Sequence, residues 1–193
     1  MNPWWPVAQV LYLFAPLLFS AALAAWVHRY DLFPRLARPI DGGATLRGRR
    51  IFGDGKTWRG ILIAVVGSIA MVSFQKHAIG ARAGALAVVD YEHANAFLLG
   101  AAIGGGAMLG ELPNSFSKRR LGIERGKTAS QPALRLLFWT WDQVDLLVIT
   151  WPILAFWLRP TFILVTTSFL PALAIHPLVA TIGYAVGARQ TAR

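Results

Sequence analysis

Long apolar stretches alternate with polar segments along the whole chain. Five of these stretches are long enough for a helix that crosses a bilayer, which takes roughly 20 apolar residues. They cover approximately residues 4–27, 57–74, 94–112, 136–158 and 162–186. The pattern predicts an all-α, polytopic membrane protein with about five transmembrane helices, and it indicates a single integral membrane domain over residues 1–193.

The first apolar stretch has to be distinguished from a cleaved signal peptide. Such a peptide begins with basic residues and ends at small residues that a peptidase recognises. No Lys or Arg precedes Arg29, and Trp26-Val27-His28 is a poor cleavage site. Trp4 and Trp5 are instead typical of the membrane interface at the start of a transmembrane helix. We therefore interpret this stretch as a transmembrane helix.

Basic residues are distributed unevenly between the two sides of the predicted membrane protein. Segments 28–59 and 113–135 carry eight and six Lys or Arg residues, and Arg189 and Arg193 add two more. The opposite side has only Lys76, Arg82 and Arg159. Positive charge favours the cytoplasmic side. We therefore expect two basic cytoplasmic loops at 28–59 and 113–135, an N-terminus outside, and a location in the cell inner membrane.

Composition narrows the class of partner. A formal net charge of +10 at pH 7 would suit a protein that binds nucleic acid. Here, however, the basic residues lie in short segments of a chain that is 55% hydrophobic, which favours the lipid bilayer and anionic ligands. The chain has no cysteine, so disulfides and a zinc–thiolate site are excluded. The oligomeric state stays open, with a homodimer as one alternative.

Two acidic residues interrupt the fourth apolar stretch. Asp142 and Asp145 are three residues apart, which places them on one face of a helix. Acidic residues in a membrane span are costly and indicate a functional site. A water-filled cavity with a divalent cation would offset this cost, and magnesium prefers carboxylate and phosphate oxygens. The alternative is that each Asp pairs with an arginine, which would have to come from a loop because the cores of the five predicted spans contain no Lys or Arg.

A second group of polar residues follows the third apolar stretch. Glu111 is either a third carboxylate of the same metal site or an interfacial residue that compensates Lys118 or Arg119. A run such as Lys118-Arg119-Arg120 is more often a topology signal than a binding site. Its position just before the helix with the two Asp residues nevertheless favours a role toward an anionic substrate.

The segment before the second apolar stretch is suited to phosphate oxygens. It reads Gly53-Asp54-Gly55-Lys56-Thr57-Trp58-Arg59-Gly60. A Walker motif would need a glycine where the chain has Arg50, so that interpretation is rejected. What remains is a flexible turn with Lys56, Thr57 and Arg59 as candidate phosphate ligands. The alternative is a basic anchor that binds anionic lipid.

Four short motifs occur in a characteristic order. They are Arg38-Pro39-Ile40-Asp41, the segment Phe52 to Gly60, the segment Ser115 to Gly122, and Asp142-Gln143-Val144-Asp145. Together they resemble the motifs of the CDP-archaeol synthase family, and the last two more distantly resemble those of bacterial CDP-diacylglycerol synthases. The resemblance covers more than half of the chain and includes the five-span layout.

Two departures from the family pattern concern the same segment. Glu111 stands where the family usually has Asp, and the longer side chain changes the reach of that carboxylate. The residues that follow, Pro113-Asn114, are also unusual for the family. The departures leave it open whether Glu111 binds metal.

The resemblance implies transfer of CMP from CTP to a lipid phosphate, with Mg²⁺ and with release of pyrophosphate. The predicted metal ligands are Asp142, Asp145 and Glu111, and the predicted catalytic residues are Asp142, Asp145, Lys118 and Arg119. The predicted substrate-binding residues are Arg38, Asp54, Lys56, Thr57, Arg59, Ser115 and Arg120. Whether the product is of the CDP-archaeol or the CDP-diacylglycerol type stays open.

The rival hypothesis is a small membrane transporter or scaffold, with the carboxylate pair as an ion or proton site. Such a relay would connect both membrane faces. No acidic residue lies deeper than Asp145, and the fifth apolar stretch has none, which disfavours a relay. An alcohol phosphatidyltransferase is also disfavoured, because the long Asp- and Gly-containing signature of that family is absent.

Overall fold

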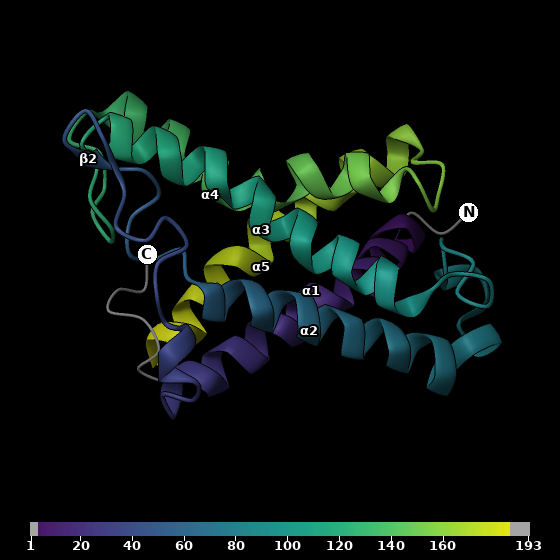
Figure 1. The fold of residues 1–193 in the computed structure, drawn as a ribbon. Helices are drawn as coiled ribbons and strands as arrows, with labels where there is room; N and C mark the ends of the chain where they lie inside the picture. The colour runs from purple at the N-terminus through teal and green to yellow at the C-terminus, as the bar shows by residue number, and fades with distance from the viewer. Residues whose placement is uncertain (1–3, 186–193) are drawn as a thin grey trace.

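Five long helices form the molecule (Figure 1). The computed structural model describes residues 4–185, without the side chains of residues 174–180 and 182–185. The helices are α1 (Trp5–Arg29), α2 (Trp58–Phe74), α3 (Ala96–Arg120), α4 (Pro132–Leu154) and α5 (Phe162–Ala185). Each predicted apolar stretch corresponds to one of them, so the helical fold is confirmed. The last predicted residue of the fifth stretch and the tail arginines, Arg189 and Arg193, lie outside the described residues.

Helix α3 is longer than the apolar pattern predicted, and α4 is shifted by four residues toward the N-terminus. The expected exit at Pro113 is wrong, because α3 continues through Pro113 to Arg120. Helix α4 begins at Pro132, four residues before the predicted start. The connecting segment is therefore only 121–131. Four of the six predicted basic loop residues lie on helices, Lys118-Arg119-Arg120 on α3 and Arg135 on α4. Proline removes one helical hydrogen bond, and contacts of the following turn with α4, described below, hold this part of α3 in place.

Three helical segments of the described chain are long and apolar enough to cross a membrane, namely α1, α3 and the stretch Trp58–Leu86 that begins with α2. Large apolar side chains such as Val66, Leu109 and Phe162 are exposed on the outer surface. An apolar surface of this kind suits lipid rather than water. The protein is therefore an integral membrane protein, whereas the count of five spans stays a prediction.

The segment between α1 and α2 has little helical structure. It contains a short 3₁₀ turn, Pro34–Leu36, and a two-stranded antiparallel hairpin of β1 (Thr45–Leu46) and β2 (Arg49–Arg50). Arg47 and Gly48 at its tip both have positive φ, at 50° and 73°. This is the backbone that a tight two-residue hairpin turn requires. The hairpin is a small addition to the predicted all-α fold.

Helix α3 lies between α2 and α4 and packs closely against both. A Cβ atom at Gly104 would overlap the backbone of Ala64 in α2, and one at Gly110 would overlap the carbonyl oxygen of Asp145 in α4. Glycine at these two positions thus allows α3 to pack closely against its neighbours. At Gly105 the corresponding space is open.

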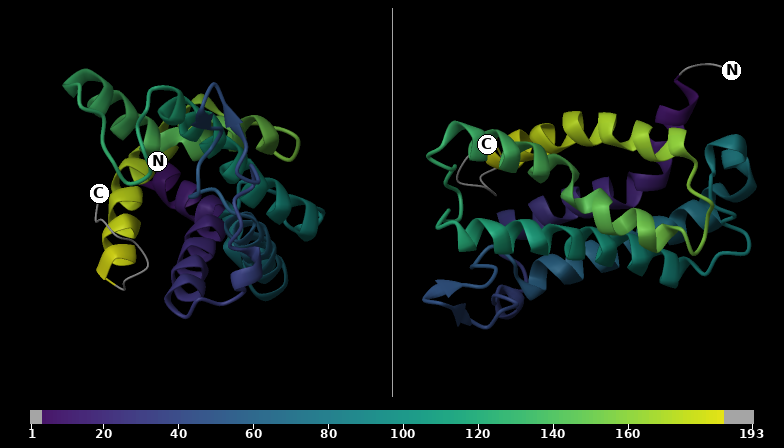
Figure 2. Two further views of the ribbon diagram at one scale, coloured as in Figure 1. Left: turned by 60° about the vertical axis from the view of Figure 1, so that its left-hand side comes forward. Right: turned by 90° about the horizontal axis from the view of Figure 1, so that it is seen from above.

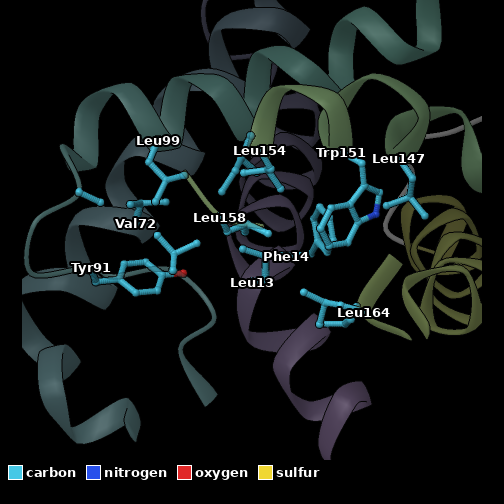
Figure 3. Close-up of a cluster of buried hydrophobic side chains, with 14 residues drawn as sticks. Leu13, Phe14, Val72, Tyr91, Leu99, Leu147, Trp151, Leu154, Leu158 and Leu164 are labelled. Carbon is cyan, nitrogen blue, oxygen red and sulfur yellow. The ribbon is translucent and has the colours of Figure 1, made fainter. Parts of the chain in front are cut away.

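The hydrophobic core lies where α1, α4 and α5 meet α3 (Figure 3). The ring of Phe14 contacts that of Trp151 edge to face, with centroids 5.6 Å apart. The indole nitrogen of Trp151 donates a hydrogen bond to Ser168 Oγ at 3.0 Å, which satisfies the one polar atom of this side chain in an apolar setting. These contacts fix α4 relative to α1 and α5.

The polar segments gather at the two ends of the helix bundle. The hairpin and segment 121–131 lie together at one end in both views of Figure 2. At the other end α2 continues into a π-helical turn, Gln75–Ile79, and a 3₁₀ segment, Gly80–Leu86. The two segments predicted to be cytoplasmic are therefore neighbours in space.

Candidate active site

One face of α3 carries polar residues against α4, at the end of the bundle where the hairpin lies. Glu111, Asn114 and Lys118 follow at intervals of three and four residues, so their side chains share this face. Opposite them on α4 are Asp142 and Asp145. The close approach of α3 and α4 at Gly110 brings the two faces within reach of one another.

Asn114 joins the two aspartates. Its amide nitrogen, Nδ2, donates to Asp142 Oδ1 at 2.7 Å and to Asp145 Oδ2 at 2.8 Å. Asn114 and Asp145 are buried, with 2% and 5% of their surface exposed, whereas 36% of the Asp142 side chain is exposed. The predicted placement of both carboxylates on one helical face is confirmed, and the pair extends from the protein interior toward solvent.

Two lysines neutralise carboxylates of this site. Lys118 forms an ion pair with Asp142, and its ammonium group lies 5.6 Å from the centre of the Phe138 ring. Lys56, which comes just before α2, forms an ion pair with Glu111. Glu111 therefore compensates Lys56 rather than Lys118 or Arg119. The alternative of an arginine partner from a loop is therefore wrong for Asp142, whose basic partner is a lysine on α3.

An apolar cavity of about 310 Å³ ends at the Lys56–Glu111 pair. Its polar end is formed by Lys56, Thr57 and Glu111. Apart from Ser20 and Ser168, the remainder is lined by apolar residues of all five helices, such as Leu18, Leu147 and Pro171. The cavity thus combines a small charged end with a long apolar wall.

The first two sequence motifs pair with each other through the backbone. Ile40 N donates to Lys56 O at 2.9 Å, and Trp58 N donates to Arg38 O at 3.1 Å. Thr57 caps α2, because its Oγ1 accepts a hydrogen bond from Gly60 N at 3.2 Å. The pairing fixes Lys56 at the mouth of the cavity. The Arg38 side chain is exposed.

Asp41 organises the segment between the two motifs. Its side chain is 1% exposed and accepts hydrogen bonds from Arg50 and from the backbone amides of Gly43, Phe52 and Gly53. Burial alone would raise the pKa of this carboxyl group. The hydrogen bonds from Arg50 and from the three amides outweigh burial and lower the pKa to about 2.

Arg59 and Arg120, two of the predicted substrate ligands, contact the protein itself. Arg59 Nη1 donates to Asp31 Oδ1 at 2.7 Å and to Leu32 O at 3.0 Å, which ties the start of α2 to the end of α1. Arg120 donates to backbone carbonyl groups of the hairpin, among them Arg49 O at 2.9 Å. The contacts of Arg120 hold the hairpin against α3.

Arg119 lies beside the glycine turn. Its side chain is close enough to Gly53 that a Cβ there would be in van der Waals contact with it. Arg119 Nε is buried and has no hydrogen-bond partner among the described residues. On the same turn, Arg125 Nη1 donates to Asp54 O at 3.4 Å. The Asp54 side chain is 68% exposed and pairs with Arg50.

The remaining predicted site residue, Ser115, is partly buried on α3, one residue beyond Asn114. The structure therefore brings Lys56, Glu111, Lys118, Asp142 and Asp145 to one region between α2, α3 and α4. The side chains of Arg59 and Arg120 instead contact other parts of the protein, the segment after α1 and the hairpin.

A set of three metal-binding carboxylates is not formed in the described part of the chain. Among the side chains that the structure describes, no group of three or more His, Asp or Glu is arranged to hold a metal ion. The donor chemistry nevertheless fits magnesium, which often uses only one or two carboxylates together with substrate phosphates. Asp142 Oδ2 and Asp145 Oδ1 are the oxygens that Asn114 does not occupy.

Two residues of this region were given no role from the sequence, Asn114 and Asp41. Asn114 was noticed only as a departure from a family pattern, although its position three residues after Glu111 and four before Lys118 puts it on the same helical face. Asp41 was noticed only as part of a motif. An Asp before two glycines often accepts a hydrogen bond from the backbone of its own turn, which is a signal that the sequence contains.

Comparisons with known proteins show which family the chain is similar to. The family model of CarS-like CDP-archaeol synthases matches residues 9–192. A CDP-archaeol synthase of Halobacterium salinarum is 37% identical over 160 residues, which cover 79% of this chain and 82% of that protein. One of Methanoculleus marisnigri is 33% identical over 159 residues, covering 79% and 87%. The chain is also similar to a solved structure of an intramembrane enzyme for archaeal membrane lipids biosynthesis, with a TM-score of 0.58, 29% identity and coverage of 89% and 92%.

The fold and these similarities define a membrane enzyme of the CTP-dependent cytidylyltransferase class, which forms a CDP-lipid. The chain belongs to the CarS-like CDP-archaeol synthase family. The resemblance seen in the four motifs is thereby confirmed, and the alternative of a transporter or scaffold is not supported.

Proposed function

We propose that the chain transfers CMP from CTP to a lipid phosphate at the end of the bundle where the hairpin lies. The observation that carries the proposal is the shape of the cavity, in which a long apolar wall ends at Lys56, Thr57 and Glu111. A lipid phosphate has the same two parts, an apolar tail and an anionic head. Its head group would lie beside Lys56, close to the aspartate pair on α4.

The basic residues divide into two roles in this proposal. Lys56 binds the lipid phosphate, and Lys118 and Arg119 bind the phosphates of CTP. In the resting state Lys56 and Lys118 are paired with Glu111 and Asp142. Substrate phosphates would replace these carboxylates as the partners of the lysines. Arg59 and Arg120 support the site from the hairpin side through their contacts with the protein.

The reaction is a displacement at the α-phosphorus of CTP. An oxygen of the lipid phosphate forms a bond to this phosphorus, the bond to the β-phosphate oxygen breaks, and pyrophosphate leaves. The attacking oxygen already carries negative charge, so a strong general base is not required. The protein contributes orientation and charge neutralisation. Lys118 and Arg119 offset the charge on the triphosphate.

Mg²⁺ is the proposed cofactor, with Asp142 and Asp145 as its protein ligands. When bound, it supplies positive charge that neutralises the phosphate oxygens and the leaving pyrophosphate. Glu111 is the weaker candidate, because it is engaged by Lys56. Release of Asp142 from Lys118 would leave both aspartates to the metal.

The proposed orientation has the hairpin end in the cytoplasm, where CTP is available, and the N-terminus outside. All five helices would cross the membrane, with the two aspartates in the middle part of α4. The support is the asymmetric distribution of basic residues together with the shared location of segments 28–59 and 121–131. Reporter fusions at Arg193 and within residues 75–93 test this. A C-terminal reporter that responds from outside would overturn the orientation.

The activity is tested with the purified protein in detergent, α-labelled CTP, Mg²⁺ and a panel of lipid phosphates. The panel contains an archaeal-type diether lipid phosphate and a diacyl phosphatidic acid, so the result also identifies the lipid class. Label in the organic phase that depends on both lipid and Mg²⁺ is the expected result. Absence of lipid-linked label with every member of the panel would overturn the proposal.

A further inference from the structure

We propose that Asn114 is the positioning residue of the metal site, and that its amide group holds Asp142 and Asp145 in a fixed orientation before the cation binds. The inference rests on the proposed function, because it assigns a role within that site. It concerns a position where the sequence departs from the family pattern. No other described residue contacts both aspartates through side-chain hydrogen bonds.

The geometry of the amide gives the first argument. An asparagine Nδ2 carries two hydrogens, and both are used here, one for Asp142 Oδ1 at 2.7 Å and one for Asp145 Oδ2 at 2.8 Å. Each carboxylate thus has one oxygen fixed by Asn114. The other two oxygens, Asp142 Oδ2 and Asp145 Oδ1, make no hydrogen bond within the described part of the chain and are free for a cation.

The second argument comes from burial. Asn114 is 2% exposed, and its Oδ1 is buried without a hydrogen-bond partner among the described residues. Leaving a buried acceptor unpaired costs free energy. Turning the amide would bring Oδ1 toward two carboxylates, which donate no hydrogen bond when ionised. The observed orientation of the Asn114 amide is therefore the one that the two aspartates require, although it leaves the amide oxygen without a hydrogen-bond partner.

The chemical argument concerns charge. Two neighbouring carboxylates repel each other, and a lysine that bridged both would compete with a cation for them. Asparagine is neutral, so it fixes the two carboxylates without adding a positive charge that would compete with the cation. Hydrogen-bond partners of metal ligands commonly change metal affinity or activity by about 10- to 100-fold when they are removed. We expect an effect of that size at Asn114.

Mn²⁺ serves as the probe, because free and protein-bound Mn²⁺ are distinguished by electron paramagnetic resonance without any turnover. The purified full chain is titrated with Mn²⁺ for the parent, Asn114→Ala and Asn114→Ser. The alanine variant should bind about 10- to 100-fold more weakly. The serine variant has a single hydroxyl donor and should lie between the two. In the transfer assay, Asn114→Ala should need more Mg²⁺, with an unchanged KM for CTP once Mg²⁺ is saturating.

A matched control separates positioning from general stability. Gln75 is also a buried amide with an unpartnered oxygen, but it lies at the other end of α2 and donates to Tyr12 O at 2.7 Å. Gln75→Ala should lower the Tm and leave Mn²⁺ affinity unchanged. Parent affinity for Mn²⁺ in both Asn114 variants would overturn the inference.

The outcome also distinguishes this inference from the proposed function. Transfer of label to lipid by a parent protein that binds no Mn²⁺ would overturn the role of Asn114 while leaving the transferase function intact. Conversely, normal Mn²⁺ binding that depends on Asn114, without transfer to any lipid phosphate, would support the positioning role and contradict the proposed reaction.

Discussion

Two basic regions lie side by side at one end of the bundle, and their positive charges are used differently. In the hairpin region, Arg120 bonds backbone carbonyl groups and Arg50 bonds the buried Asp41. In the α3–α4 region, Lys118 and Lys56 are paired with the partly exposed carboxylates Asp142 and Glu111. Backbone carbonyl groups stay with their donors as long as the loop is folded. A carboxylate such as that of Asp142 can instead exchange its lysine partner for a metal ion. The lysine is then free to bind a phosphate group.

The role of a basic residue near a substrate site therefore depends on the group with which it is paired in the folded protein. From the sequence, Lys118 was a predicted catalytic residue, and Lys56, Arg59 and Arg120 were predicted to bind substrate. Their partners now divide them into residues that maintain the loop and residues that can exchange one anion for another. The predictions below follow that division, from the largest expected effect to the smallest.

The largest effect is expected at the two aspartates. Asp142→Asn and Asp145→Asn keep the size of the side chain and remove its charge. Because the carboxylates are the proposed metal ligands, each variant should lose about 100-fold or more of its transfer rate. Initial rates of lipid labelling at saturating CTP and Mg²⁺ measure the effect, and melting curves verify that the variants are folded. Retention of more than half of the parent rate in both would contradict the metal role.

The next effect concerns the crossing of α3 and α4. In Gly110→Ala the new Cβ would overlap the carbonyl oxygen of Asp145, so the helices have to separate. We expect a loss of about 1–3 kcal/mol or more in the free energy of unfolding, together with reduced activity because Asn114 moves away from its carboxylates. Gly105→Ala on the same helix is the control, since its space is open. Equal melting temperatures for the two variants would argue against this crossing.

A pair of substitutions compares the two basic regions directly. Lys56→Ala should weaken substrate binding about tenfold to a hundredfold through loss of a charge-assisted contact, with little change in Tm. Arg59→Ala should instead lower the free energy of unfolding by about 1–3 kcal/mol, because it loses contacts with Asp31 and Leu32. Lys127, an exposed lysine paired with Glu124, supplies the control Lys127→Ala. Isothermal titration and thermal melting provide both readouts, and a reversed pattern would show that the division by partner is wrong.

The smallest effect is a pH dependence of the hairpin region. The pKa of Asp41 is lowered from 3.8 to about 2, so the folded state favours its ionised form. The stabilisation is complete above pH 3.8 and is lost as the pH falls through about 2. The Tm difference between the parent and Asp41→Asn should therefore shrink as the pH is lowered from 5 toward about 2. A constant difference over this range would mean that the charge of Asp41 is not involved.

Much of the fold could be predicted from the apolar pattern, because helices in a bilayer need long apolar stretches. The pattern failed around Pro113 and at the start of α4. Helix α3 extends beyond Pro113 into polar sequence, where contacts with α4, such as that of Asn114 with Asp142, replace apolar burial in stabilising the helix. Apolar periodicity contains no information about such contacts.

The site was predicted in part. The spacing of Asp142 and Asp145 sufficed to put them on one face, since that depends only on helix geometry. The choice of partners could not be predicted. Whether Glu111 pairs with Lys56 or Lys118 depends on how α2 and α3 are placed relative to each other. The role of Asn114 likewise depends on the packing of α3 against α4, which brings its amide to Asp142 and Asp145.

The most direct test of the account is the Mg²⁺ dependence of two properties in one protein preparation, the Tm and the transfer of labelled CMP to lipid. The parent should gain thermal stability with Mg²⁺ and transfer label in the same concentration range. The double variant Asp142→Asn/Asp145→Asn should fold, with a Tm in the absence of metal at least equal to that of the parent. It should show neither stabilisation by Mg²⁺ nor transfer. A double variant that still transfers CMP at the parent rate would contradict the account.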